Sequence, residues 1–75
     1  MAHLEQSEGA LRLRHYLHRK YLTQAQFAEA IPVTPATVNR WLSGALLPSE
    51  AAARCIELCT GIRAGLWRRP ARVVA

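Results

Sequence analysis

The sequence predicts an all-α protein that folds as one compact domain of four or five short helices. Side chains that favour helix starts recur along the chain, at Ser7, Thr23, Thr34 and Ser49. Residues that end helices follow them at short intervals, at Pro32, Gly44 and Gly61. The 75 residues suffice for a single domain, and 51% hydrophobic with 20% charged residues is typical of a globular chain.

The first helix is expected over residues 10–21. Apolar side chains recur there at spacings of three and four, at Ala10, Leu13, Tyr16 and Leu17, with basic residues between them. This periodicity predicts an amphipathic helix, for which Ser7 is a candidate N-cap. We expect the folded domain over residues 10–69, after a poorly ordered N-terminal segment, residues 1–9, and before a tail, residues 70–75.

The second helix has three concordant start signals. Thr23 can cap it, Gln26 can return the hydrogen bond as in a capping box, and Leu22 can pack on Phe27 as a hydrophobic staple. Pro32 disfavours helical angles at the residue before it, so this helix is expected to end near residue 30.

The third helix begins with the same kind of pattern. Thr34 is its cap, Pro35 occupies the first helical position, where a missing N–H costs nothing, and Val33 can pack on Val38. Gly44 can adopt the left-handed conformation that ends it.

A fourth helix is predicted from Ser49 to residues 60–61, and a short fifth helix over residues 62–68. The residues expected to face the core from the fourth helix are Ala52, Cys55, Ile56 and Cys59. Both cysteines are expected to be reduced and buried, because their spacing suits a bridge poorly and free cysteine is among the most buried residue types. Leu66, Trp67 and Val73 are candidate dimer contacts, since their apolar surface is otherwise hard to bury.

Composition narrows the class of function. Ten Lys or Arg residues against five Glu residues, with no Asp, give a net charge of +5, which favours a polyanionic partner. The chain has no glycine-rich phosphate loop and no cluster of metal ligands, so we expect no enzymatic activity, metal or cofactor. It also has no signal-peptide pattern and no apolar run long enough for a membrane span, so we expect a cytoplasmic, nucleoid-associated protein.

The second and third helices together predict a helix-turn-helix. They abut through a tight turn, and the small Ala28 would let them approach at a wide angle. The apolar residues expected between them and the other helices are Phe27, Ile31, Val33, Val38 and Trp41. With these inward, the residues expected to point outward from the third helix are Thr34, Ala36, Thr37, Asn39 and Arg40.

The stretch TQAQFAEAIPVTPATVNRWLSG, residues 23–44, resembles the lambda-repressor/Cro (XRE-type) helix-turn-helix. With the flanking LRLRHYLHRKYL and LPSEAAARCIELCTG, the resemblance extends over about residues 11–61 and is closest to small Cro-like and YdaS-type regulators. It implies a four- or five-helix bacterial or phage transcription regulator, most often a repressor. Such a protein binds a double-stranded DNA operator, usually as a homodimer.

The resemblance also implies roles for individual residues. Gln24 would bind a DNA phosphate. The base-facing positions would be Thr34, Ala36, Thr37 and Arg40, with Asn39 at their edge. The arginine fork suits guanine, and small methyl-bearing side chains suit thymine. Because basic residues gather in the first helix and after residue 61, Arg14 and Lys20 are further candidates for phosphate contacts.

Two features leave alternatives open. The family usually has glycine at the positions of Tyr21 and Pro32, and proline resists a positive φ, so the turn is expected to depart from the family geometry. The same fold can also serve as a protein-binding module, such as an antitoxin that neutralises a toxin and binds DNA secondarily. Arg40 would then be an ordinary solvated arginine, and Gln24 would only complete the first turn of its helix.

Overall fold

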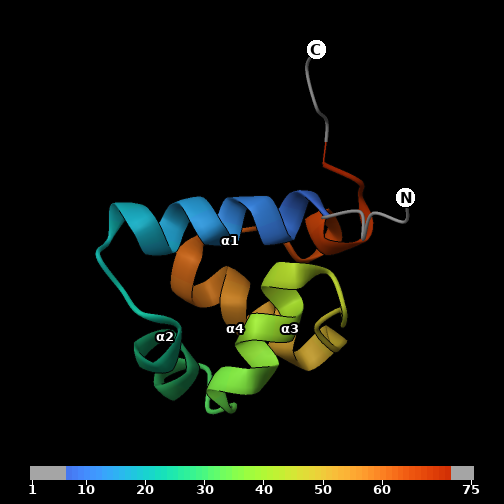
Figure 1. Ribbon diagram of the computed structural model, residues 1–75. Coiled ribbons are helices and arrows are strands. Elements are labelled where there is room, and N and C mark those ends of the chain that lie inside the picture. Colours follow the sequence, from blue (N-terminus) through green and yellow to red (C-terminus); the bar gives the residue numbers. More distant parts are fainter. Residues whose placement is uncertain (1–6, 72–75) are drawn as a thin grey trace.

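Four α-helices and one 3-10 helix make up the part of the chain that the structure, a computed structural model, describes, residues 7–71 (Figure 1). In chain order they are α1 (Glu8–Arg19), α2 (Gln24–Ala30), α3 (Pro35–Ser43), α4 (Glu50–Thr60) and the 3-10 helix η1 (Ala64–Arg68). Figure 1 shows α1 running across one side of the molecule, with η1 beside its N-terminal end and α2 and α3 on the other side. The all-α fold class is confirmed.

All four expected N-caps form. The hydroxyls of Ser7, Thr23, Thr34 and Ser49 each accept a hydrogen bond from the backbone N–H three residues later, at distances of 3.1, 3.0, 3.2 and 3.2 Å. At α2 the capping box is complete, because the Thr23 N–H also donates to Gln26 Oε1 at 2.8 Å. These local bonds satisfy donors that a helix start leaves unpaired, so the starts of α2, α3 and α4 fall where the sequence indicates.

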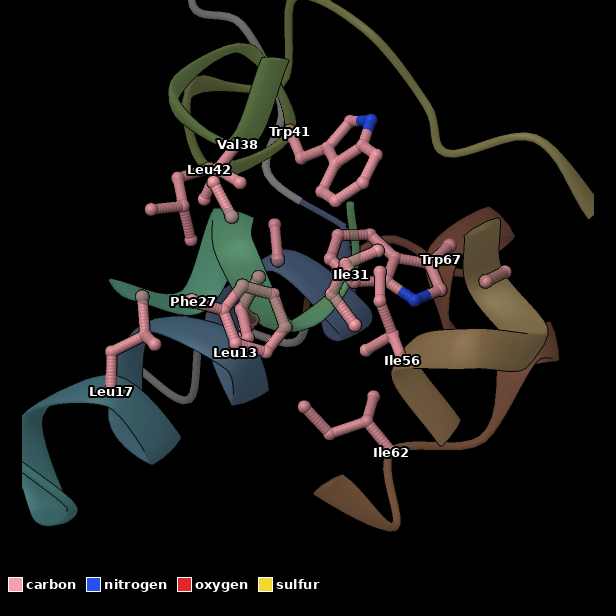
Figure 2. Close-up of a cluster of buried hydrophobic side chains, with 13 residues drawn as sticks. Leu13, Leu17, Phe27, Ile31, Val38, Trp41, Leu42, Ile56, Ile62 and Trp67 are labelled. Carbon is pink, nitrogen blue, oxygen red and sulfur yellow. The ribbon is translucent and has the colours of Figure 1, made fainter. Parts of the chain in front are cut away.

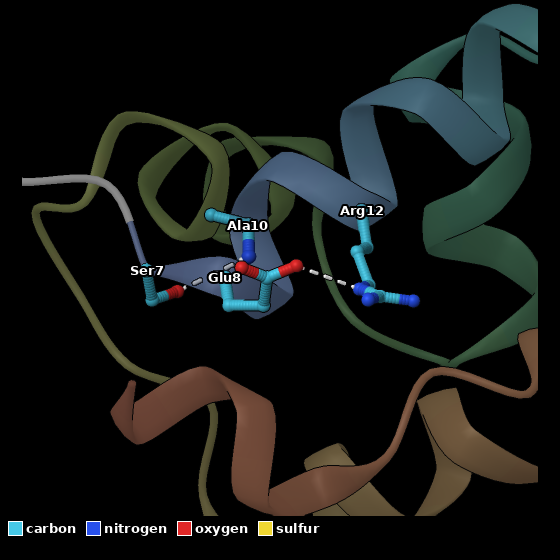
Figure 3. A network of polar contacts seen from close by, with 4 residues as sticks. All are labelled: Ser7, Glu8, Ala10 and Arg12. Carbon is cyan, nitrogen blue, oxygen red and sulfur yellow. Dashed lines mark hydrogen bonds and ion pairs between the residues drawn. The ribbon is translucent and has the colours of Figure 1, made fainter. Parts of the chain in front are cut away.

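The start of α1 lies earlier than its apolar periodicity suggests. The helix begins at Glu8, and Glu8 accepts from Arg12 Nε at 2.8 Å across one helical turn (Figure 3). The Glu8 N–H donates to the Arg69 carbonyl at 2.7 Å, and Ser7 forms an antiparallel bridge with Pro70. Residues 7–9 therefore belong to the folded unit, which joins the two ends of the described chain.

One continuous core holds the helices together (Figure 2). Its buried residues are Ala10, Leu13, Leu17, Phe27, Ala28, Ile31, Val38, Trp41, Leu42, Ala53, Ile56, Ile62 and Trp67. The ring centroids of Trp41 and Trp67 lie 6.4 Å apart with planes inclined at 59°, a tilted aromatic pair of the kind that stabilises cores. None of the described helices is long and apolar enough to cross a membrane.

The expected burial of Cys55 and Cys59 is wrong. Both thiols are free and exposed, and α4 instead buries Ala53 and Ile56. The helix has small or apolar residues on most of its circumference, so its sequence alone does not select which side faces the core.

The expectation that proline excludes a positive φ in the turn is also wrong. Pro32 has a φ of 27°, and Tyr21 has a φ of 56°, so both positions at which the family has glycine keep a left-handed backbone. Val33 N–H donates to the Ala28 carbonyl at 3.0 Å, which closes the turn after α2. The packing of the helices is retained, and the strain of a positive φ lies in the backbone of these two residues.

Candidate nucleic-acid interface

The helix-turn-helix is built from the elements that the sequence predicts. Phe27, Ala28 and Ile31 at the end of α2 are buried together with Val38 and Trp41 of α3. The partly buried Leu22 and Val33, one before each helix cap, pack against this core. The positions of both helices are therefore fixed by apolar contacts on their inner sides.

The opposite side of α3 is open to solvent. Its exposed residues, which we call the recognition face, are Ala36, Asn39, Arg40 and Ser43. They recur at spacings of three and four and so lie along one side of the helix. Of the five residues expected to point outward, Thr34, Ala36, Asn39 and Arg40 are exposed, and Thr37 is partly buried.

Arg40 lies in the middle of the recognition face. Its side chain is exposed and makes no hydrogen bond or ion pair with any residue in the described part of the chain. A guanidinium presents five N–H donors in a planar fork and stays charged, so Arg40 offers an unused site for a planar or anionic acceptor.

Asn39 and Gln24 are joined across the two helices. Asn39 Nδ2 donates to Gln24 Oε1 at 3.4 Å, which links the recognition face to the first residue of α2. Sequence reasoning assigned the two residues separate roles and missed this contact. No local spacing indicates it, because it depends on how α2 and α3 cross.

Thr34 and Thr37 are less available than expected. Thr34 Oγ1 caps α3 and lies 2.9 Å from Thr37 Oγ1, and Thr37 is only partly exposed. Their hydroxyls are thus committed to the helix start. Ser43, which the sequence analysis did not select, shares the exposed side, but its hydroxyl donates to the Arg40 carbonyl at 3.2 Å and accepts from Ala45 N at 3.4 Å.

Arg14 in α1 and Lys20 directly after it, the two basic residues expected to contact DNA phosphates, differ in their surroundings. Arg14 Nη2 donates to the Leu42 carbonyl at 3.3 Å, in the last turn of α3, where a positive charge also complements the helix dipole. Lys20 is exposed, and its Nζ lies 6.0 Å from the centroid of the Tyr16 ring. Arg14 therefore ties α1 to α3, whereas Lys20 is free to reach outward.

The residues predicted to form dimer contacts do not make up a surface patch. Trp67 is only 2% exposed and packs inside its own chain, so it cannot meet a partner, and that expectation is wrong. Leu66 is partly buried and also packs against the core. Val73 lies outside the described residues. The indole ring of Trp67 is covered by Gly9 of α1 and by Trp41 of α3.

Comparison with known proteins agrees with this geometry. No curated protein matches the chain. A family model described as a helix-turn-helix domain matches residues 10–66, which include α2, the turn and α3. The match is consistent with the resemblance to the lambda-repressor/Cro type of helix-turn-helix. The chain belongs to the helix-turn-helix domain family, and this membership points to a DNA-binding regulator.

Proposed function

We propose that the protein is a sequence-specific regulator of transcription that inserts α3 into the major groove of an operator. The observation that supports this most strongly is the uncovered recognition face, with Arg40 at its centre exposed and without a side-chain partner among residues 7–71. The major groove admits one α-helix, and there every base pair presents a distinct pattern of donors and acceptors.

Each outward side chain of α3 suits a particular contact. Arg40 has the fork that pairs with guanine O6 and N7, and Asn39 has the amide that pairs with adenine. Ala36 and the methyl groups of Thr34 and Thr37 suit thymine methyls. In this proposal Asn39 is held by Gln24, which reduces the conformational freedom it loses on binding.

Phosphate contacts supply the rest of the affinity. Gln24 begins α2 and can donate to a phosphate together with free backbone N–H groups, while Lys20 adds a solvent-exposed positive charge. Arg14 holds α3 to α1 and contributes positive potential near the DNA. The net charge of +5 favours approach to a polyanion.

We further propose that two copies bind a palindromic operator and repress by occupying a promoter. In such a complex the recognition helices would enter successive major grooves about 34 Å apart. A dimer doubles the number of base contacts, which a single short helix with few outward side chains requires for specific binding.

Selection of bound sequences from random duplexes tests the proposal. The wild-type protein should enrich a motif containing guanine. Arg40→Ala should lose preference at one base pair of each half-site, corresponding to about 1–3 kcal/mol. Arg40→Lys is the matched control, because it keeps the charge but lacks the fork, and should lose the base preference with a smaller loss of affinity. All three should unfold at similar temperatures, since the side chain is exposed.

Two outcomes would contradict the proposal. An unchanged motif and affinity in Arg40→Ala would exclude Arg40 from base recognition. The absence of any motif at every salt concentration, together with tight capture of a protein encoded by a neighbouring gene, would favour the antitoxin alternative instead.

A further inference from the structure

Two cysteine thiols lie on the same outer side of α4. Cys55 and Cys59 are both free and exposed, and they are four residues apart on one helix. Residues at this spacing are neighbours on the helix surface, with Cβ atoms about 5–6 Å apart. A metal–thiolate bond is about 2.3 Å long, so two sulfurs on opposite sides of one ion lie roughly 4.6 Å apart. The two side chains can therefore reach a single ion between them.

The backbone that carries the two thiols is held in place. Ile56, next to Cys55 in the chain, is fully buried in the core. The Thr60 hydroxyl donates to the Ile56 carbonyl at 2.7 Å, and the Tyr16 hydroxyl of α1 donates to the Cys59 carbonyl at 3.5 Å. The spacing of the thiols is thus fixed by the fold before an ion binds, and only their rotamers remain to be selected.

The surroundings of the thiols favour a soft ion with few ligands. The neighbours of Cys55 at three and four positions along α4 are all uncharged: Ala51, Ala52, Leu58 and Cys59. Within residues 7–71, no three or more His, Cys, Asp or Glu side chains are grouped so that they could hold a metal ion. Zinc takes three or four protein ligands, so two thiols serve it poorly. Thiolates select soft ions such as Cu(I), which is stable between two sulfurs.

We propose that Cys55 and Cys59 bind one Cu(I) ion in a two-coordinate site on the C-terminal half of α4. Each thiol releases its proton to solvent, and each thiolate sulfur forms one bond to the ion. Neither sulfur nor copper changes its oxidation state. Because binding releases two protons, the affinity should rise with pH. The site is separate from the proposed DNA contacts, which lie on α2, α3 and the end of α1.

Competition with bicinchoninate, a chromophoric chelator of Cu(I), measures the affinity under anaerobic, reducing conditions. The wild-type chain should take up one Cu(I) ion, and native mass spectrometry should find that ion on a single chain. Cys55→Ser and Cys59→Ser should each bind at least about a hundredfold more weakly, because the second thiolate no longer adds its bond within the same molecule. Both positions are exposed, so circular dichroism should show the wild-type helix content in both variants.

Two double variants that keep two thiols per chain test the spacing. Ala51 is exposed and lies four residues before Cys55. Ala51→Cys/Cys59→Ser therefore restores a pair four residues apart and should bind Cu(I) within about tenfold of the wild type. Ala51→Cys/Cys55→Ser separates the thiols by eight residues, about 12 Å along the helix, and should bind as weakly as the single variants.

Thermal unfolding gives a second readout. An ion that joins two successive turns of α4 binds only the folded chain, so one equivalent of Cu(I) should raise the unfolding temperature of the wild type. Ala51→Cys/Cys59→Ser should show a similar rise, and Cys59→Ser should show none.

Three results would overturn the inference. The first is a wild-type chain that binds Cu(I) no more tightly than the single serine variants. The second is an equal affinity of the two double variants, which would show that thiol number matters and spacing does not. The third is a complex that forms only between two chains, which would exclude a site within one helix. None of them bears on the sequence motif in the selection experiment.

Discussion

Gly9 in α1 lies directly against the indole ring of Trp67 in η1, where the two ends of the fold meet. A Cβ built on Gly9 would lie 2.6 Å from Cδ2 of Trp67, closer than any real contact of this kind. The indole is rigid and 2% exposed, so it cannot move aside without disturbing Trp41. Glycine is therefore required here by packing, although an alanine would favour the helix.

We predict that Gly9→Ala lowers the free energy of unfolding by about 1–3 kcal/mol, since overpacking outweighs the gain in helix propensity. Thermal and urea unfolding followed by circular dichroism would measure the change. Gly65→Ala is the control, because a Cβ on Gly65 meets nothing within 4 Å, and its stability should change by less than about 0.5 kcal/mol. Equal effects of the two substitutions would contradict the close approach to Trp67.

Pro32 occupies a strained position in the turn between α2 and α3. Its ring prefers a φ near −65°, whereas its φ in the turn is 27°. Pro32→Gly should therefore raise the free energy of unfolding by about 1 kcal/mol or more, because glycine accepts a positive φ without strain. Chemical denaturation measures this change.

Pro35→Gly is the matched control for that substitution. Pro35 occupies the first helical position of α3, where its ring fits, so replacing it should lower stability by about 0.4–1 kcal/mol. The two variants should thus change stability in opposite directions. A destabilised Pro32→Gly would show that the turn does not strain the ring.

At the scale of single helices, short-range chemistry determines where each one begins. The hydroxyl caps of α2, α3 and α4 could be predicted, because each cap lies next to the helix start that it determines. The same holds for the left-handed glycines that end α3 and α4, which are Gly44 with a φ of 84° and Gly61 with a φ of 81°. The packing of α3, with Val38 and Trp41 inward and Arg40 outward, could be predicted for the same reason: its apolar and polar residues separate cleanly by helical spacing.

The features that could not be predicted depend on contacts between distant segments. The burial of Trp67 requires Gly9 and Trp41 beside it, and no periodicity in either segment indicates that meeting. The exposure of Cys55 and Cys59 depends on which side of an evenly apolar α4 packs inward. The bond between Asn39 and Gln24 likewise follows from the crossing of two helices.

The capping box of α2 gives a prediction for a whole element. Thr23→Ala removes the acceptor of the Gln26 N–H bond and should lower the free energy of unfolding by about 1 kcal/mol. Thr23→Ser keeps the oxygen and should stay close to the wild type. Hydrogen exchange of the α2 amides would locate the effect, and faster exchange spread evenly over all helices would contradict a local role for the cap.

For the whole molecule, the net charge of +5 and the proposed phosphate contacts predict strong dependence of DNA binding on salt. Affinity for the selected duplex should fall linearly with the logarithm of salt concentration. Lys20→Ala should weaken binding to all sequences alike and reduce the slope by about 0.9 for each copy. Fluorescence anisotropy titrations at several salt concentrations would measure it. A slope near zero would mean that phosphate contacts contribute little.

Nuclear magnetic resonance of the isotope-labelled protein tests most directly whether the uncovered side of α3 contacts bases. On addition of the selected duplex, the side-chain N–H signals of Arg40 and Asn39 should shift more than those of the α1 arginines, and the Arg40 signals should show contacts to base protons of the major groove. Unchanged Arg40 and Asn39 signals in a fully bound complex would show that this side of α3 does not contact bases.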